Sequence, residues 1–208
     1  MSRSSSVSRL SIALAGIMTI LILAGCSSSP TAHAQTVLKE NSAMAPRENS
    51  TMKDAFDELM KRPSLTAAEA DYQSMLHTIQ ERLVTEVGIA EWVPDDQPVS
   101  GTFCGGDLSN LDDAGQKCID TGVSIGNLPD ARWDQAVAIV TEVAGQHGFG
   151  APGVIVDGPG DHEISFRGRY EGELIFGTGG GTILTVSTGC HLKEEAHRRG
   201  TYLPPKVL

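Results

Sequence analysis

The stretch TAAEADYQSMLHTIQERLVTEV, residues 66–87, decides the fold class because its apolar residues recur at helical spacing. They share one helical face: Ala68, Tyr72, Met75, Leu76, Ile79, Leu83 and Val87. Thr66 and Glu69 match a capping box, and Gly88 is a natural C-cap. The opposite face is mostly acidic, whereas a helix lying in a membrane interface would carry a basic polar face. We therefore expect an amphipathic helix of about 22 residues packed on a core.

Two further helices flank this one. Upstream, Thr51 and Asp54 match a second capping box, with apolar residues at helical spacing before Pro63. Downstream, Asp130 follows Pro129 as a cap or first-turn acid, and Gly148 marks the end. The apolar stripe of the downstream helix consists of Trp133, Ala136, Val137, Val140, Val143 and Ala144.

The C-terminal third is predicted to form a sheet, because short runs of alternating apolar and polar residues are separated by glycine-rich turns. The expected strands are Val154–Val156, Ile164–Phe166, Tyr170–Phe176 and Thr182–Thr188, with shorter ones at Thr102–Cys104 and Val123–Ile125. The residues from Asp107 to Asp120 are expected to form a polar loop. Helices mostly precede strands, which predicts an α+β fold. We expect an antiparallel four- to five-stranded sheet with two main helices, Thr66–Val87 and Trp133–Ala144, on one face.

The N-terminus carries export signals. Arg3 and Arg9 precede an apolar run from Leu10 to Leu23, which ends in Leu23-Ala24-Gly25-Cys26. This lipobox resembles that of bacterial lipoproteins, in which the cysteine receives a diacylglyceryl thioether and becomes residue one after cleavage. An uncleaved membrane-spanning helix is the alternative, but about 14 residues fall short of the roughly 20 that a span needs.

The expected organisation is a signal peptide at 1–25, a lipidated flexible tether at 26–50 and a single α+β globular domain at 51–208. The tether would reach roughly 25–30 Å as a flexible coil. Acyl chains such as palmitate on Cys26 would hold the protein to the extracytoplasmic side of the cell membrane. Cys26 is the residue for which the sequence predicts a function.

Charge limits the partners. Removing residues 1–25 takes away two arginines and no acid, which changes the formal net charge from −10 to −12. Such an acidic surface repels phosphate backbones and anionic head groups, so we expect no nucleic-acid partner. We expect membrane attachment only through the lipid on Cys26, and the protein or small-molecule partner stays unassigned.

Three further cysteines, Cys104, Cys118 and Cys190, would lie in a compartment that permits disulfides. Cys190 is expected on an inward strand face, well placed to bridge to Cys104. A bridge between Cys104 and Cys118, closing a loop of about 15 residues, is the local alternative. The sequence leaves the pairing open.

The residues that could form catalytic or metal sites are better interpreted as structural. The glycine-rich run 177–182 lacks the lysine of a phosphate-binding loop and is expected to be a hairpin turn. Asp157, Asp161, His162 and Glu163 lack a calcium-loop pattern and are expected in a solvated hairpin. A zinc or thiol site built on Cys190, His191 and His197 conflicts with disulfide formation and burial. We predict no catalytic residue, no metal site and no cofactor.

The lipobox, the Trp133 helix ending in Gly148-Phe149-Gly150-Ala151-Pro152, and the closing run Thr188-Gly189-Cys190-His191-Leu192 resemble the mycobacterial LppA/LppB/LppV-type lipoproteins. The resemblance implies an envelope lipoprotein without an assigned reaction, and it supplies no catalytic residue. Three hypotheses follow: a non-enzymatic binding or interaction protein, a carrier of a lipid or other amphiphile between helices and sheet, and an enzyme or metal protein at His162 or Cys190.

Overall fold

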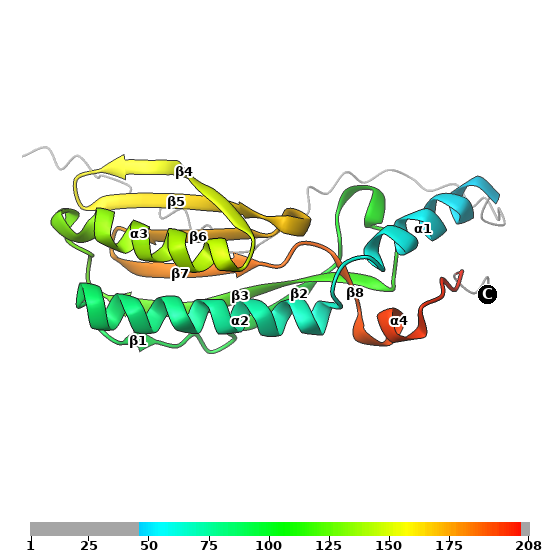
Figure 1. The fold of residues 1–208 in the computed structure, drawn as a ribbon, viewed down its shortest axis with the longest axis horizontal. Coiled ribbons are helices and arrows are strands. Elements are labelled where there is room, and N and C mark those ends of the chain that lie inside the picture. The colour runs from blue at the N-terminus through cyan, green and yellow to red at the C-terminus, as the bar shows by residue number, and fades with distance from the viewer. Residues whose placement is uncertain (1–45, 205–208) are drawn as a thin grey trace, which may run out of the picture. The chain divides into compact units, whose positions relative to one another are not determined.

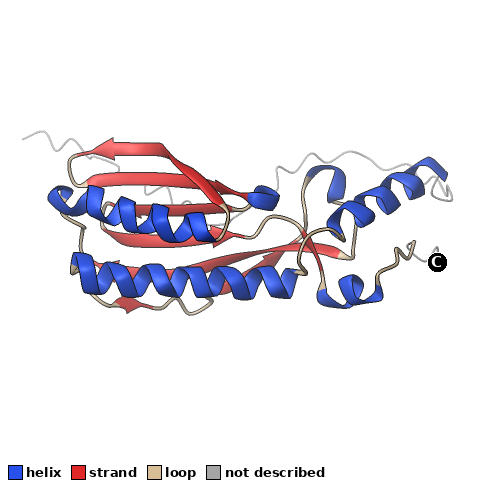
Figure 2. Ribbon diagram, in the orientation of Figure 1, coloured by secondary structure: helices blue, strands red, loops and turns tan. Residues whose placement is uncertain are grey.

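The computed structural model describes residues 46–204, so the predicted signal peptide, Cys26 and most of the predicted tether lie outside the described residues. The fold is α+β, as expected. Two main helices, α2 (Leu65–Arg82) and α3 (Asp130–Gln146), cover one face of an antiparallel sheet (Figures 1 and 2). The sheet has 8 strands, more than the four to five predicted.

The sheet is built around a long strand and a meander. The meander consists of β4 (Phe149–Gly158), β5 (Asp161–Gly168), β6 (Glu173–Thr178) and β7 (Gly181–Ser187), in which each strand pairs with the next. The long strand β3 pairs with β7, and it also pairs with three short strands: β1 (Trp92–Val93), β2 (Val99–Thr102) and β8 (His191–Leu192).

The largest error of the sequence prediction is β3, which spans Ala114–Ile125 where a polar loop up to Asp120 was expected. Its pairing with β7 shifts between Asp120 and Val123, and Gly122 between them has a φ of 81°. Such a bulge exchanges the two faces of a strand and interrupts the alternation on which the prediction depends. The strand was therefore hidden by its own irregularity.

The helix limits also differ from the prediction. The first helix, α1, spans Pro46–Leu59 and begins before the expected Thr51. The predicted capping box of α2 is wrong, because Ser64 is the N-cap and its side chain accepts a hydrogen bond from the Ala67 N–H at 3.3 Å. A π-helical turn, Leu83–Val87, extends α2 to Gly88, whose φ of 78° makes it the predicted C-cap.

Apolar side chains form two separate clusters. The main core lies between the sheet and the helices α2 and α3, and it includes Ile79, Leu83, Val140, Phe166, Leu174, Phe176 and Leu184. The small core lies where α1, β8 and the short helix α4 (Glu194–Arg199) meet, and it consists of Met52, Phe56, Leu59, Cys104, Leu111, Ala114, Cys190, Leu192 and Ala196. Figure 1 shows α1 and α4 beyond one end of the two main helices.

Candidate functional site

Cys26, the predicted lipid attachment site, lies outside the described residues, and its modification stays a prediction. The other candidate side chains fall into two groups. One surrounds a disulfide beside the small core, and the other surrounds His162 at the β4–β5 hairpin.

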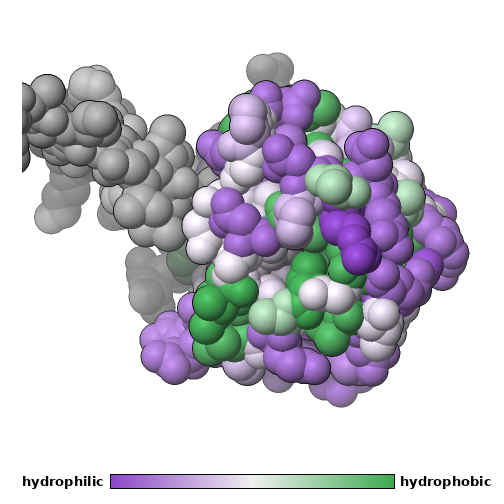
Figure 3. All heavy atoms as spheres, turned by 90° about the vertical axis from the view of Figure 1, so that its left-hand side faces the viewer, coloured by the Kyte–Doolittle hydropathy of each residue, from purple (hydrophilic) through white to green (hydrophobic). Residues whose placement is uncertain are grey.

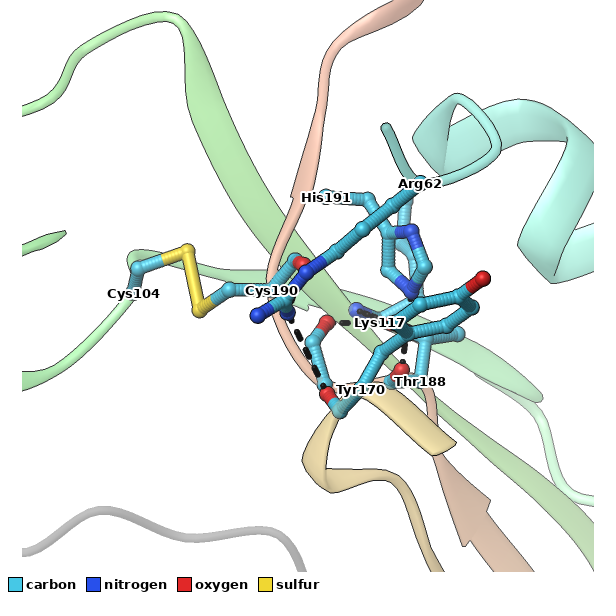
Figure 4. Close-up of a disulfide and its surroundings, with 8 residues drawn as sticks. Arg62, Cys104, Lys117, Tyr170, Thr188, Cys190 and His191 are labelled. Carbon is cyan, nitrogen blue, oxygen red and sulfur yellow. Dashed lines mark hydrogen bonds between the residues drawn. A yellow bond between two sulfur atoms is a disulfide. The ribbon is translucent and has the colours of Figure 1, made fainter. Parts of the chain in front are cut away.

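The disulfide joins Cys104 to Cys190 across 86 positions, with a Cα–Cα distance of 5.7 Å (Figure 4). Of the two pairings considered, this is the one expected from an inward-facing Cys190; both cysteines are buried. Cys190 was predicted to lie on an inward strand face. It instead follows the end of β7, because the chain turns at Gly189, whose φ is 72°. A Cβ at Gly189 would stand 1.9 Å from the Tyr170 carbonyl oxygen, so the turn requires glycine.

Cys118 takes no part in this bridge. It lies on β3, where it pairs in register with Ser100 of β2 and Ser187 of β7. The local alternative, a bridge from Cys104 to Cys118, is therefore not formed.

Arg62, in the connection between α1 and α2, lies beside the Cys104–Cys190 disulfide. Its Nη1 donates to the Cys190 carbonyl at 2.9 Å and to the Tyr170 carbonyl at 3.5 Å. Its guanidinium also stands 5.3 Å from the centroid of the Tyr170 ring. Tyr170 and Glu171 have positive φ values of 61° and 65°, which are unfavourable for residues with side chains. The Arg62 contacts help to hold this strained turn in place.

His191 is fully buried between the same segments. Its Nδ1 lies 2.9 Å from the Pro63 carbonyl and its Nε2 lies 3.0 Å from the Thr188 carbonyl. Burial lowers the pKa of His191 below its ordinary value, while the two carbonyl oxygens act in the opposite direction and nearby Arg62 adds to the lowering. A neutral ring donates through only one nitrogen. His191 thus acts as a cross-link and is not exposed for metal binding or base catalysis.

The C-terminal helix adds further bonds to the same connection. His197 Nε2 lies 2.9 Å from the Arg62 carbonyl, and the Ser64 hydroxyl donates to Glu194. Residues 62–64 are therefore tied to residues 190–197 by a set of polar bonds. We use the name disulfide cluster for Arg62, Ser64, Cys104, Tyr170, Cys190, His191, Glu194 and His197.

His162 forms the second group. It was expected in a solvated hairpin, but only 8% of it is exposed. Its ring stacks on Trp133 at 4.8 Å, its Nδ1 lies 3.0 Å from Asp157, and its Nε2 lies 3.3 Å from Asp130. The pKa of Asp130 is lowered, first by the Gly160 N–H that donates to it and then by His162. This group fastens the β4–β5 hairpin to the start of α3. Sequence reasoning missed it, although Trp133 and His162 were both noticed.

The remaining motifs have structural roles. The glycine-rich run forms the predicted turn between β6 and β7. Asp95 accepts a hydrogen bond from the Gln97 N–H at 2.7 Å, and Asp113 pairs with Arg199 of α4. Within residues 46–204, no group of three or more His, Cys, Asp or Glu side chains is placed to hold a metal ion. In the same range, no helix has the length and apolarity to cross a membrane.

A pocket of about 310 Å³ lies at the end of the two main helices where α3 begins. Residues 87–90, 124–129 and Arg132 line it, and Arg132 donates to the Val87 carbonyl at 3.1 Å. Figure 3 views the molecule from this side and shows apolar patches among hydrophilic residues. The carrier hypothesis requires a cavity between α2 and the sheet. Fully buried side chains, including Leu83, Leu174 and Leu184, instead pack at that interface.

Among the comparisons with known proteins, a solved structure shows a similar fold and a family profile shows the family. A crystal structure of a Mycobacterium tuberculosis protein described as the lipoprotein LppA superposes with a TM-score of 0.51 at 13% identity, covering 76% of this chain and 96% of that one. A DUF4853 family protein from Actinomyces odontolyticus matches with a TM-score of 0.41 at 14% identity, covering 76% and 77%. A search of curated proteins found no significant match. The profile of the LppA family, described as lipoproteins confined to pathogenic Mycobacterium, matches residues 40–194. The chain therefore belongs to the LppA lipoprotein family, as the sequence resemblance indicated.

Proposed function

We propose that this protein is a lipid-anchored, non-enzymatic binding protein of the cell envelope, attached through Cys26, whose disulfide cluster fastens the anchored end of the chain to the sheet. The observation that carries the proposal is that residues 62–64, which follow the first helix, are tied to residues 190–197 by four hydrogen bonds. The side chains that form them are those of Arg62, Ser64, His191 and His197.

The position of these bonds suits an N-terminal anchor. A lipid on Cys26 would place any pull on the chain upstream of α1, and α1 joins the rest of the fold through residues 60–64. The bonds at this connection, together with the small core, would pass such a pull to β3 through β8. A lipid-anchored protein with a loosely attached first helix would instead risk local unfolding near the membrane.

The side chains best suited to nucleophilic or metal chemistry are already used in structural bonds, and this supports a non-enzymatic role. Cys104 and Cys190 are joined in a disulfide, so neither sulfur is available as a thiolate. His191 and His162 each have both ring nitrogens beside an oxygen of a structural partner. These residues stabilise the fold through the same atoms that catalysis would require.

The test is the intact mass and membrane association of the full-length protein and of Cys26→Ala, with Ser27→Ala as the matched control. We expect the wild type and Ser27→Ala to carry a diacylglyceryl modification and to partition with detergent. Cys26→Ala should lack the modification, and it should be released or accumulate as precursor, while disulfide mapping still finds Cys104 joined to Cys190. An unmodified Cys26 in the membrane-bound wild type would overturn the proposal.

A further inference from the structure

The outer edge of β4 carries an unusual amount of apolar surface. β4 is the last strand in the sheet order, and within residues 46–204 it pairs only with β5. Three consecutive side chains, on Val154, Ile155 and Val156, are 70%, 52% and 37% exposed. Neighbouring side chains of a strand point to opposite faces, so this run presents apolar surface on both sides of the edge. Such an edge is a template for pairing with another strand.

The other side of the sheet shows how the same fold protects an edge. There, β1 and β2 have only 2 and 4 residues, and short edge strands discourage pairing with other chains. β4 has 10 residues, and none of those from Phe149 to Val156 is charged. Pro152 and two irregularities, between Phe149 and Pro152 and between Val154 and Val156, interrupt its outer edge without adding charge. The protein therefore protects one edge of its sheet with short strands and leaves the other edge long, uncharged and apolar.

The charges at the two ends of β4 have opposite signs. Arg169 is exposed beside the beginning of the strand. Its backbone N–H donates to the Gly148 carbonyl at 3.3 Å, and its side chain lies against Gly148. Asp157, with a side chain that is 73% exposed, lies near the end of the strand. When two copies of one strand pair antiparallel about a two-fold axis, the beginning of each lies opposite the end of the other.

We propose that two copies of this protein associate by antiparallel pairing of their β4 strands, which forms one continuous sheet across a two-fold axis. Each Arg169 then lies toward the Asp157 of the other copy, and the uncharged central residues meet at the axis. Without residues 1–25 the chain has a formal net charge of −12, so two copies repel each other over most of their surfaces. Local charge complementarity and an uncharged centre make β4 the surface at which this repulsion is smallest.

The first test is sedimentation equilibrium of the full lipidated chain in density-matched detergent. We expect a concentration-dependent dimer. Ile155→Lys places a charge within the uncharged paired stretch, opposite the beginning of the other β4, and should raise the dimer dissociation constant more than about tenfold. Phe103→Lys is the matched control, because Phe103 is a 74% exposed apolar residue away from β4. That variant should dimerise like the wild type.

The second test addresses the charge order. Arg169→Glu should weaken the dimer, and adding Asp157→Lys in the same chain should restore it by exchanging both charges. Because Asp157→Lys also removes the contact with His162 Nδ1, the single Asp157→Lys variant is measured beside it and should be as weak a dimer as Arg169→Glu. Increasing salt should weaken the wild-type dimer, and circular dichroism checks that each variant is folded. A monomer at all concentrations would overturn the proposal and leave the edge for a strand of a different protein. A dimer unaffected by Ile155→Lys would also overturn it.

Discussion

The main core and the small core differ in what holds them together. The main core buries large apolar side chains from two long helices and five strands, and most of its members have less than 5% of their surface exposed. The small core has fewer apolar residues, contains a disulfide, and is bordered by a guanidinium and two histidines. Limited apolar burial near the anchored end is thus supplemented by a covalent bond and by polar cross-links.

This contrast leads us to expect two levels of stability. Apolar burial contributes in proportion to buried area, so the main core should set the global free energy of unfolding. The disulfide cluster should instead govern opening of α1, β8 and α4. The following substitutions test this division, from the largest expected effect to the smallest.

Phe166→Ala should have the largest effect. Phe166 is fully buried in the main core, and deleting such a ring removes transfer free energy and leaves a cavity. We expect a loss of about 3–5 kcal/mol in the free energy of unfolding, measured by urea denaturation. Phe103→Ala, at a 74% exposed position, is the control and should change it little. Equal losses in the two variants would contradict this description of the main core.

Replacing both Cys104 and Cys190 by serine should cost about 2–4 kcal/mol, because the bridge closes a loop across 86 positions. We expect the loss to be local. Hydrogen exchange should become faster in α1, β8 and α4, with less change in α3 and β6. Uniformly faster exchange throughout the described residues would show that the two cores unfold together.

Acidification should weaken the small core through His191. Because burial lowers the pKa of His191 in the folded state, the unfolded chain binds the proton more readily near pH 6. The contribution of neutral His191 is therefore present above about pH 6.5 and is lost as the pH falls. His191→Gln should flatten the dependence of unfolding free energy on pH between 5 and 7.

The control for this pH effect is His77→Gln. The His77 side chain is 72% exposed on α2, so its replacement should leave the pH dependence nearly unchanged. Should His191→Gln and the wild type show the same slope, His191 would not be the group responsible.

Ser64→Ala should have the smallest effect, a loss of about 1 kcal/mol, because it removes the N-cap of α2 and one bond to Glu194. Ser74→Ala, at an exposed position inside α2, is the control and should be neutral or slightly stabilising. Thermal denaturation of both variants makes the comparison. A larger loss at Ser74 would mean that the cap is misassigned.

The sequence could predict features that depend on neighbouring residues. The apolar stripe from Ala68 to Val87 and the stop at Gly88 were correct because helical spacing and left-handed caps are local properties. The meander from β4 to β7 was also recognisable, since short glycine-rich turns join strands that pair with their neighbours in sequence. The strand β3 was missed because the bulge at Gly122 and polar residues such as Lys117 and Asp120 conceal its alternation.

The sequence by itself determined the family resemblance, the α+β class and the prediction of lipid attachment at Cys26, because each rests on a contiguous motif or a local period. Only the tertiary structure decided that Cys104 bonds Cys190, that Arg62 caps the turn at Tyr170, and that His162 bridges Asp130 and Asp157. The first two of these contacts join residues that are 86 and 108 positions apart. No local pattern encodes such pairs, since they form only when the packing of β3 and β8 brings distant segments together.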